Sequence, residues 1–369
     1  MKFRGFDFSL REFSGALGDF GTLMPFSIGY IVVCGFNPTG LLLGIGLTNI
    51  CLAFFYRLPL PVQPKKAIGT IAIANHWPAS RVWGAGFGVG VIWLGLAAVK
   101  GGHMLSKVPK CVIRGIQLGL AVLLGLTGAE MLKTDLYLAI PLLTLALLLL
   151  RNRILPAALF LLGLGGLIAW LTGTLQLSTL KVTLALPSLY TFSLGDLLYG
   201  LAYAGIAQLF LTLTNAVVAT VALVHDLFPD RRDVTPQNLI LNMGLMNVTT
   251  PLIGGMPLCH GAGGLAAQYL FGARTGGALF MEGAVEIFLG LFCAQSILAI
   301  FTAFPPVVIG VMLFLAATEL GRVALDLERK EEVFIMALTA LLSATFNIAV
   351  GFVAGLLVYF GVKRNLIRL

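Results

Sequence analysis

Apolar segments of near-membrane length follow one another along almost the whole chain, separated by short polar turns. A helix needs about 20 apolar residues to cross a bilayer, and helices satisfy all their backbone polar groups internally there. Charged residues make up only 11% of the 369 residues, whereas soluble domains carry about 25%. The sequence therefore predicts an all-α, multi-pass membrane protein without a soluble domain.

The apolar pattern predicts fourteen membrane segments in two sets of seven. Residues 1–172 hold the first set, 173–194 form a polar connector, and 195–369 hold the second set. Several of the segments are too short to cross alone. We expect them at 12–34, 38–56, 65–75, 82–100, 108–128, 136–150, 154–172, 195–224, 236–253, 261–271, 277–297, 305–321, 332–344 and 346–361.

The two sets resemble each other in sequence. Leu43–Ile50 is similar to Leu241–Val248, and Pro59-Leu60 then aligns with Pro257-Leu258 without a gap. An insertion around 225–237 in the second set accounts for a change of spacing upstream. Because seven is an odd number, the second copy must enter from the opposite face. This predicts an inverted repeat, an architecture that many secondary transporters share.

The distribution of basic residues supports the same topology. With both termini inside, only Arg81, Lys133 and Lys181 fall outside, apart from two lysines within the membrane segments. Cytoplasmic loops carry an excess of Lys and Arg, so the net charge of +8 reflects loop topology and not a nucleic-acid partner. We expect a multi-pass protein of the cell (inner or plasma) membrane, in contact with lipid, with cytoplasmic termini.

The stretch Pro59–Thr70 breaks the third segment. Three prolines in six residues force extended backbone and remove donors, and Gln63, Lys65 and Lys66 follow where lipid tolerates few polar groups. A helix that starts inside the membrane directs free N–H groups at its surroundings and attracts anions. The expected anion contacts here are Gln63, Lys65, Lys66 and the backbone at Ala67.

The matching stretch of the second copy, Gly255–Ala266, breaks the tenth segment. Glycines open its helix at Gly261, Gly263 and Gly264, directly after His260. Two half-helices that enter from opposite faces would bring two positive dipole ends together. The alternative is a pair of merely kinked helices relieved by their neighbours. We favour a binding site because an intramembrane lysine is a functional candidate.

Other polar residues within the segments have open roles. Gln63 and His260 could cap the half-helices instead of contacting a ligand, and Thr22 is a further candidate contact. Asp19 is a candidate proton carrier or the counter-charge of a lysine. Asn49 and Asn247 fit interhelical hydrogen bonds. Gln208 lies mid-span in the eighth segment, and the acidic residues within or near spans are Glu282, Glu286 and Glu319.

Enzyme and metal signatures are absent from the sequence. It holds no GxSxG, HExxH or Walker-type motif, and its five cysteines form no CxxC pair. We therefore expect neither an enzyme nor a cofactor or metal site, and an ATP-driven pump is disfavoured.

The two broken stretches closely resemble the molybdate transporter family, a branch of the sulfate permease superfamily. Pro61–Ile68 is similar to the family signature PVQPMKxI, with Lys66 in the place of the signature lysine and Lys65 replacing Met. Met256–Gly276 is similar to MPxCHGxGGLAxQYxFGARxG, with Leu270 replacing Arg, and Glu12–Thr22 resembles the family's first span.

This resemblance implies the seven-plus-seven fold of sulfate and uracil permeases, with a core domain that moves against a gate domain. It implies an oxyanion held between the third and tenth segments. The cytoplasmic STAS domain of many sulfate permeases is expected to be missing, since the sequence stops directly after the last segment.

We therefore predict a secondary active transporter of a tetrahedral oxyanion, molybdate first and sulfate second, in which proton coupling through Asp19 is an option. A nucleobase permease of the same fold is a rival, but it would want a carboxylate in the eighth or tenth segment, where Gln208 and Gly261–Gly264 stand. An anion channel and a membrane sensor are further alternatives. The sequence is compatible with more than one coupling ion and with either a monomer or a homodimer.

Overall fold

A computed structural model describes residues 2–3, 5–99, 108–149, 157–322, 326–364 and 366, without the side chains of residues 2, 3, 158, 159, 214 and 215. Within these ranges the chain is mostly helical, as predicted. The ends of three expected segments, at 100, 150 and 154–156, lie outside the described residues.

The first half begins with a small hairpin and then runs through helices that follow the predicted segments. Its elements are β1 (Lys2–Phe3), β2 (Phe6–Asp7), α1 (Leu10–Ala16), η1 (Leu17–Asp19), α2 (Phe20–Val32), α3 (Pro38–Tyr56), β3 (Val62–Pro64), α4 (Lys66–Ala74), α5 (Ala79–Ala98), α7 (Lys110–Leu132), α8 (Leu136–Leu149) and α9 (Ala157–Leu171).

The second half opens with a long helical run that contains two π-helical stretches, η3 and η4. Its elements are η2 (Leu177–Thr179), α10 (Leu194–Gly200), η3 (Leu201–Gly205), α11 (Ile206–Leu211), η4 (Thr212–Val218), α12 (Ala219–Leu227), α13 (Pro236–Thr249), η5 (Thr250–Ile253), β4 (Leu258–His260), α14 (Ala262–Phe271), α15 (Gly277–Phe292), α16 (Ala294–Ala303), α17 (Pro306–Arg322), α18 (Lys330–Thr345) and α19 (Ile348–Lys363).

The structure differs from the expected segments at one turn and in its short strands. The segment expected at 277–297 ends at Phe292, and α16 leaves it at an angle of 87°. The turn falls at Cys293, whose residue conformation is not helical. Two pairs of short antiparallel strands, β1–β2 and β3–β4, interrupt the otherwise helical fold. Apolar periodicity could not reveal α16, because its composition continues that of α15.

Four helical runs of the described part are long and apolar enough to cross a membrane alone. They are α3, α5, α7 and the continuous run Leu194–Leu227, and the bent pair α15–α16 passes the same test as one unit. Shorter apolar helices such as α8 and α19 accompany them. A short helix such as α4 or α14 is stable at membrane depth where neighbouring protein satisfies its ends.

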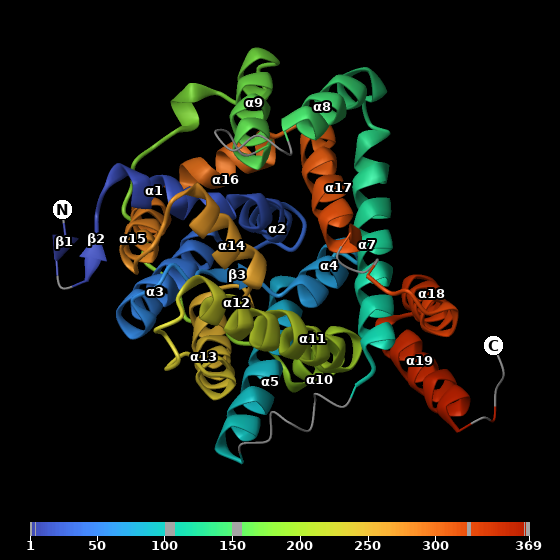
Figure 1. Ribbon diagram of the computed structural model, residues 1–369. Helices are drawn as coiled ribbons and strands as arrows, with labels where there is room; N and C mark the ends of the chain where they lie inside the picture. Colours follow the sequence, from blue (N-terminus) through green and yellow to red (C-terminus); the bar gives the residue numbers. More distant parts are fainter. Residues whose placement is uncertain are drawn as a thin grey trace.

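The helices gather into two groups. Figure 1 shows α1–α5 and α10–α15 packed together, with α7, α17, α18 and α19 along one side and α8 and α9 beside α17. Within the first group, α3 packs against α15 and α5 against α13; within the second, α7 packs against both α17 and α18. We call the first group, α1–α5 and α10–α15, the core. We call the second group, α7–α9 and α17–α19, the gate, and α4 lies at the junction between the two.

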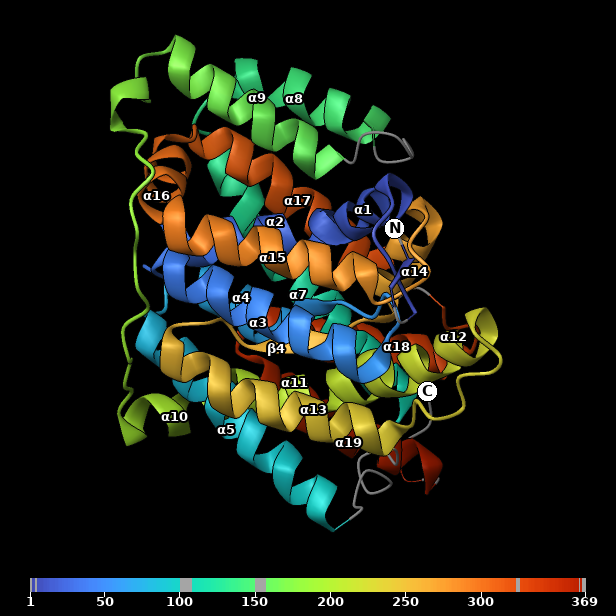
Figure 2. The same cartoon turned by 90° about the vertical axis from the view of Figure 1, so that its left-hand side faces the viewer.

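The connector between the halves is an extended strap. It is held by backbone bonds from Thr183 and Ala185 to the end of α15, and from Tyr190 to Leu252. Figure 2 shows it along one end of the helices, whereas the α12–α13 turn lies at the opposite end.

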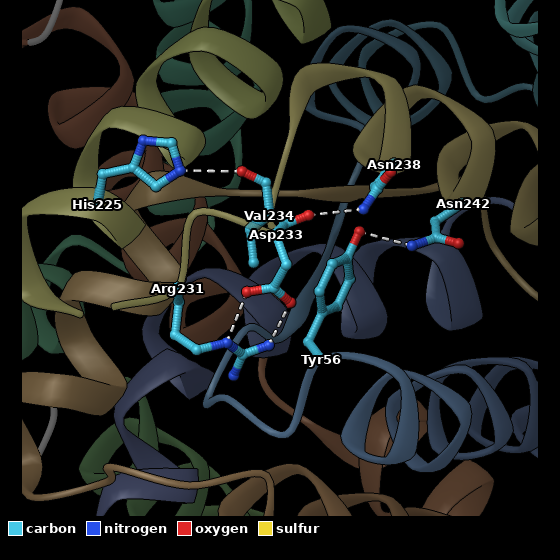
Figure 3. Close-up of polar contacts among 7 residues, drawn as sticks. All are labelled: Tyr56, His225, Arg231, Asp233, Val234, Asn238 and Asn242. Atoms are coloured by element: carbon cyan, nitrogen blue, oxygen red, sulfur yellow. Dashed lines mark hydrogen bonds and ion pairs between the residues drawn. The ribbon is translucent and has the colours of Figure 1, made fainter. Parts of the chain in front are cut away.

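The α12–α13 turn coincides with the insertion that the repeat comparison predicts at 225–237, and its polar contacts give it a defined shape (Figure 3). Arg231 pairs with Asp233 through two hydrogen bonds of 2.8 and 2.7 Å, and His225 contacts the Val234 carbonyl at 3.0 Å. The Arg231 side chain lowers the pKa of Asp233. Asn238 closes the turn by donating to the Asp233 carbonyl.

Candidate functional site

Two short strands, β3 and β4, pair in antiparallel orientation directly before the short helices α4 and α14. In β3 and β4, Val62 pairs with His260 and Gln63 with Cys259. Pro64 of β3 and Pro257, directly before β4, have no N–H to donate. The donors that remain find partners, and the Lys65 N–H donates to the Pro257 carbonyl at 2.9 Å. Asn49 and Asn247 accept from the Val62 and Leu258 N–H groups at 3.2 and 2.9 Å. These bonds satisfy the non-helical backbone that a membrane interior otherwise penalises.

Each strand delivers the chain to the start of a short helix. Lys65 precedes α4 and Gly261 precedes α14, both in extended conformation. The two broken segments therefore place two helix N-termini beside the same strand pair. Helix N-termini carry partial positive charge and free N–H donors.

A cavity of about 330 Å³ lies at these helix starts, between core and gate. Its polar lining combines amide, basic and acidic side chains with the glycine-rich start of α14. It is lined by Gln63, Lys66, Arg114, Gln117, Gln208, Leu211, Thr212, Ala216, Ala219, Cys259, His260, Gly261, Ala262, Gly263, Glu319 and Leu320.

A second cavity of about 440 Å³ adjoins the first, and Lys66, Glu319 and Leu320 line both. Thr22 lies in this second cavity, apart from Gln63. Arg322, at the end of α17, lines it too. Thr22 and Gln63 thus face Lys66 from different cavities.

The two adjacent lysines have different surroundings. Lys66 is partly exposed and lines both cavities, and no carboxylate of the described residues lies within ion-pair distance of it. Lys65 is fully buried, and its Nζ has no hydrogen-bond partner among the described residues. Of the two, Lys66 supplies the accessible charge.

Gln63 connects the strand pair to Asp19. Its Nε2 donates to Asp19 Oδ1 at 2.5 Å, and both side chains are buried. A Cβ on Gly264 would lie 2.9 Å from both Asp19 Oδ2 and Gln63 Nε2, and one on Gly261 would overlap Gln63 Oε1. Glycine is therefore required sterically at Gly261 and Gly264, whereas Gly263 faces open space.

The two helix starts differ in how their N–H groups are used. In α4, Gln208 Oε1 accepts from Ala67 at 2.8 Å and Ile68 at 3.4 Å, while its Nε2 donates to Thr212. The Ala67 N–H is therefore occupied by Gln208 in this conformation and does not face the cavity. In α14, no acceptor among the described residues takes the N–H groups of Ala262–Gly264.

His260 is fully buried in β4 and lines the first cavity. Its ring makes an edge contact with Tyr56, 5.8 Å between centroids. The Tyr56 hydroxyl accepts from Asn242 of α13 at 2.6 Å (Figure 3). His260 is thus anchored through Tyr56 to the helix that carries the α12–α13 turn.

Four residues at the cavity were not assigned to it from the sequence: Gln208, Arg114, Gln117 and Glu319. Gln208 is detectable as a polar residue mid-span, but its partners at 67 and 68 are distant in sequence. Arg114 donates to Gln117 at 2.8 Å and pairs with both oxygens of Asp326 at 2.8 and 2.7 Å. Arg114 and Lys110 lower the pKa of Asp326 to about 2.

The chemistry available is that of anion binding. Among the described residues, no group of three or more His, Cys, Asp or Glu side chains gathers to hold a metal ion. A cationic side chain, an amide and free N–H groups surround a space between two helix groups. These are the groups that stabilise an oxyanion by charge-assisted hydrogen bonds.

Comparison with known sequences identifies relatives over nearly the whole chain. A family profile described as "Molybdate transporter of MFS superfamily" matches residues 11–124 and 200–320, more than half of the chain. Molybdate transporters 1 and 2 of Arabidopsis thaliana are 29% and 28% identical, each over 95% of this chain and 87% of the relative. Molybdate transporter 1 of Chlamydomonas reinhardtii is 37% identical over 48% of this chain and 35% of its own length.

Solved structures share the fold. The transmembrane domain of the cyanobacterial bicarbonate transporter BicA aligns with a TM-score of 0.70 at 16% identity, over 96% of this chain and 98% of that domain. Murine Slc26a9, an anion transporter in its inward-facing state, aligns with a TM-score of 0.73 at 12% identity, over 100% of this chain and 70% of that protein. At these identities, the likeness is one of fold.

Proposed function

The chain belongs to the molybdate transporter family, and on that premise we propose that it is a secondary active transporter whose substrate is molybdate. The observation that carries the proposal is the convergence of Lys66, Gln63 and the open start of α14 on one cavity between core and gate. A tetrahedral dianion there receives donors from Lys66 and from the N–H groups of Ala262–Gly264. The second cavity, with Thr22, is its path to one membrane face.

Affinity in this site comes mainly from charge-assisted bonds. Each helix end contributes about 0.3–2 kcal/mol toward an anion, whereas hydrogen bonds to charged groups contribute about 1.5–3 kcal/mol each. Lys66 therefore contributes most, and Gln63 adds a second side-chain donor once its hydrogen bond to Asp19 is exchanged for one to the anion. Gln208 leaves the Ala67 and Ile68 N–H groups to the substrate when it rotates away.

Transport follows from movement of the core against the gate. We propose a seven-plus-seven inverted repeat with both termini cytoplasmic in the cell membrane, and α4 and α14 as half-helices of the third and tenth segments. The packing supports it, because α3 against α15 and α13 against α5 are the same contact with the copies exchanged. The fold likeness to two anion transporters supports a place in the sulfate permease superfamily.

Asp19 is the proton carrier in this proposal. Its Oδ2 is buried, without a partner in the described part of the chain, and adjacent to Gly264 at the start of α14. An ionised Asp19 and a bound dianion would repel each other at this short range. Binding of molybdate therefore favours protonated Asp19, which couples anion entry to proton uptake.

Molybdate uptake into proteoliposomes tests the proposal, with sulfate and tungstate as competitors. We expect saturable uptake of labelled molybdate, and we expect unlabelled molybdate to inhibit this uptake more strongly than sulfate does. Stronger inhibition by sulfate would indicate a sulfate transporter, and uptake of uracil would indicate a nucleobase permease. Unitary currents would indicate a channel, and binding without flux would indicate a sensor.

A further inference from the structure

Behind the anion cavity, the core buries two more carboxyl groups that the proposed transport step does not use. Glu282 and Glu286 lie one turn apart on the same face of α15, and both are at least 97% buried. Residues at i and i+4 are neighbours on a helix. Because α15 packs against α3 and α1, this acidic face points into the core and not into lipid.

Each glutamate is held by one amide and keeps one oxygen free. Gln268 Nε2 donates to Glu282 Oε2 at 2.7 Å, and Asn49 Nδ2 donates to Glu286 Oε2 at 3.1 Å. In the described part of the chain, Oε1 of each glutamate and Oε1 of Gln268 have no hydrogen-bond partner. The unpaired Gln268 oxygen lacks a donor, and a protonated carboxyl beside it is the group that can supply one.

The charged groups around the pair offer no compensation. No Lys, Arg or His of the described residues forms an ion pair with either glutamate. Asp19 of η1 acts electrostatically on both, and Lys66 acts on Asp19. On the other neighbouring elements, the Glu12 carboxylate is bound by the Arg274 and Thr275 N–H groups, and Arg11 and Asp7 lie on α1 and β2.

An ionised carboxylate without a cation is strongly destabilising in a protein interior. Together with Asp19, the region would hold three such charges, so protons must occupy it in this conformation. The amides also connect the glutamates to the anion site. Asn49 binds the Val62 backbone of β3, and Gln268 belongs to α14 and reaches the Ala16 carbonyl at 3.4 Å, three residues before Asp19.

We propose that Glu282 and Glu286 form a second proton-binding site that exchanges one proton with the medium in each transport cycle, in addition to the proton on Asp19. This inference rests on the proposed molybdate transport. A dianion at the start of α14 disfavours negative charge on the glutamates, so proton binding and anion binding strengthen each other. Two protons balance the two charges of molybdate, so the bound protons and the anion together add no net charge to the carrier.

The stoichiometry gives a quantitative test. With the membrane potential held at zero and a pH gradient of about one unit, each coupled proton multiplies the equilibrium accumulation of molybdate by about ten. We expect about hundredfold accumulation for the wild-type protein, and about tenfold for the double variant Glu282→Gln/Glu286→Gln. Glutamine keeps the size and the acceptor oxygen of a protonated glutamate. The control Glu130→Gln removes an exposed acid at the end of α7 and should accumulate as the wild type does.

Counterflow of molybdate against molybdate separates the two proposals, because exchange needs no net proton movement. Absence of counterflow in the wild type would refute molybdate transport itself. Counterflow together with unchanged accumulation in the double variant would show that the glutamates keep their protons permanently, and would overturn the second site.

If the double variant shows no counterflow, infrared difference spectra of the wild type on addition of molybdate test whether Glu282 and Glu286 exchange a proton. A change in the protonated-carboxyl C=O band that is absent from Glu282→Gln or Glu286→Gln supports exchange. A band that is the same in the wild type and both single variants contradicts it.

Discussion

Lys65 and Lys66 are adjacent in sequence, yet the turn from strand to helix sends their side chains into different surroundings. Lys65 is the last extended residue before α4 and points into protein, whereas Lys66 is the first helical residue and reaches both cavities. A desolvated ammonium without a partner is destabilising. The accessible charge and the charge that costs stability therefore belong to separate residues.

Substitution of the two lysines should separate these effects. Lys66→Gln removes a charge-assisted contact worth about 1.5–3 kcal/mol, so molybdate Kd should rise by about tenfold to about 150-fold. Lys65→Met, which restores the residue usual in the family signature, should raise the Tm and leave Kd close to the wild-type value. Isothermal titration and thermal unfolding of the purified protein measure both. Equal loss of affinity in the two variants would contradict the assignment of Lys66.

Gly264 provides a steric test of the same site. A methyl group there would lie 2.9 Å from Asp19 Oδ2 and Gln63 Nε2, and must push apart the pair that faces α14. We expect Gly264→Ala to weaken molybdate binding by about fivefold or more, since overpacking of this kind costs about 1–3 kcal/mol. The matched control is Gly95→Ala on α5, where a Cβ meets nothing within 4 Å. Binding that survives in Gly264→Ala would place the anion elsewhere.

At the scale of elements, the start of α4 is closed by a side chain from the other half of the chain. Gln208 of α11 accepts from two N–H groups of α4, the groups that the proposed substrate would otherwise bind. Gln208→Glu puts a carboxylate at this positive helix end, an arrangement that stabilises the helix and repels a dianion. We expect the variant to keep its Tm and to lose molybdate uptake in proteoliposomes. Wild-type uptake would show that α4 does not contact the anion.

The gate contains an ion-pair latch between α7 and the segment that follows α17. Arg114 holds Asp326 through two bonds, and the pKa of Asp326 falls from 3.8 to about 2. The latch is therefore fully present above about pH 4 and is lost as the pH falls through 2. Its contribution is constant between pH 5 and 8, so a pH dependence of transport in that range belongs to other groups.

Asp326→Asn should lower the stability by about 1 kcal/mol or less, because the Asp326 side chain is 42% exposed and solvent screens the pair. The loss should be the same at pH 5.5 and pH 8, and should shrink as the pH approaches 2. Thermal unfolding across this range measures it. A loss that grows toward acidic pH would assign the stabilisation to a different group.

The sequence predicted the helical class, because apolar run length acts locally. It also predicted the family, because the motifs that carry the resemblance are continuous in the chain. Val62 pairs with His260, 198 positions away, and the Ala67 N–H donates to Gln208, 141 positions away. No local sequence pattern encodes such long-range pairings. Arg114 was predictable only as a basic residue near the inner face. Its role at the cavity depends on how α7 packs beside α4 and α17.

For the whole molecule, the two cavities and the two helix groups predict a carrier that is open to one membrane face. The second cavity includes Arg322, which the proposed topology puts on the cytoplasmic side. The connector lies at the opposite end of the helices from the α12–α13 turn (Figure 2). The site should therefore be reached from the cytoplasm in this conformation, and access should depend on the substrate.

Cysteine labelling in proteoliposomes tests this orientation. With the five native cysteines replaced, Ala316→Cys in the second cavity should react with a membrane-impermeant maleimide only from the cytoplasmic side. Molybdate should slow the reaction, because an occupied site shifts the protein toward conformations in which the cavity is closed. Leu189→Cys on the exposed connector is the control, and should react only from the other side at a rate that molybdate leaves unchanged. Equal labelling of Ala316→Cys from both faces would indicate an open pore and contradict alternating access.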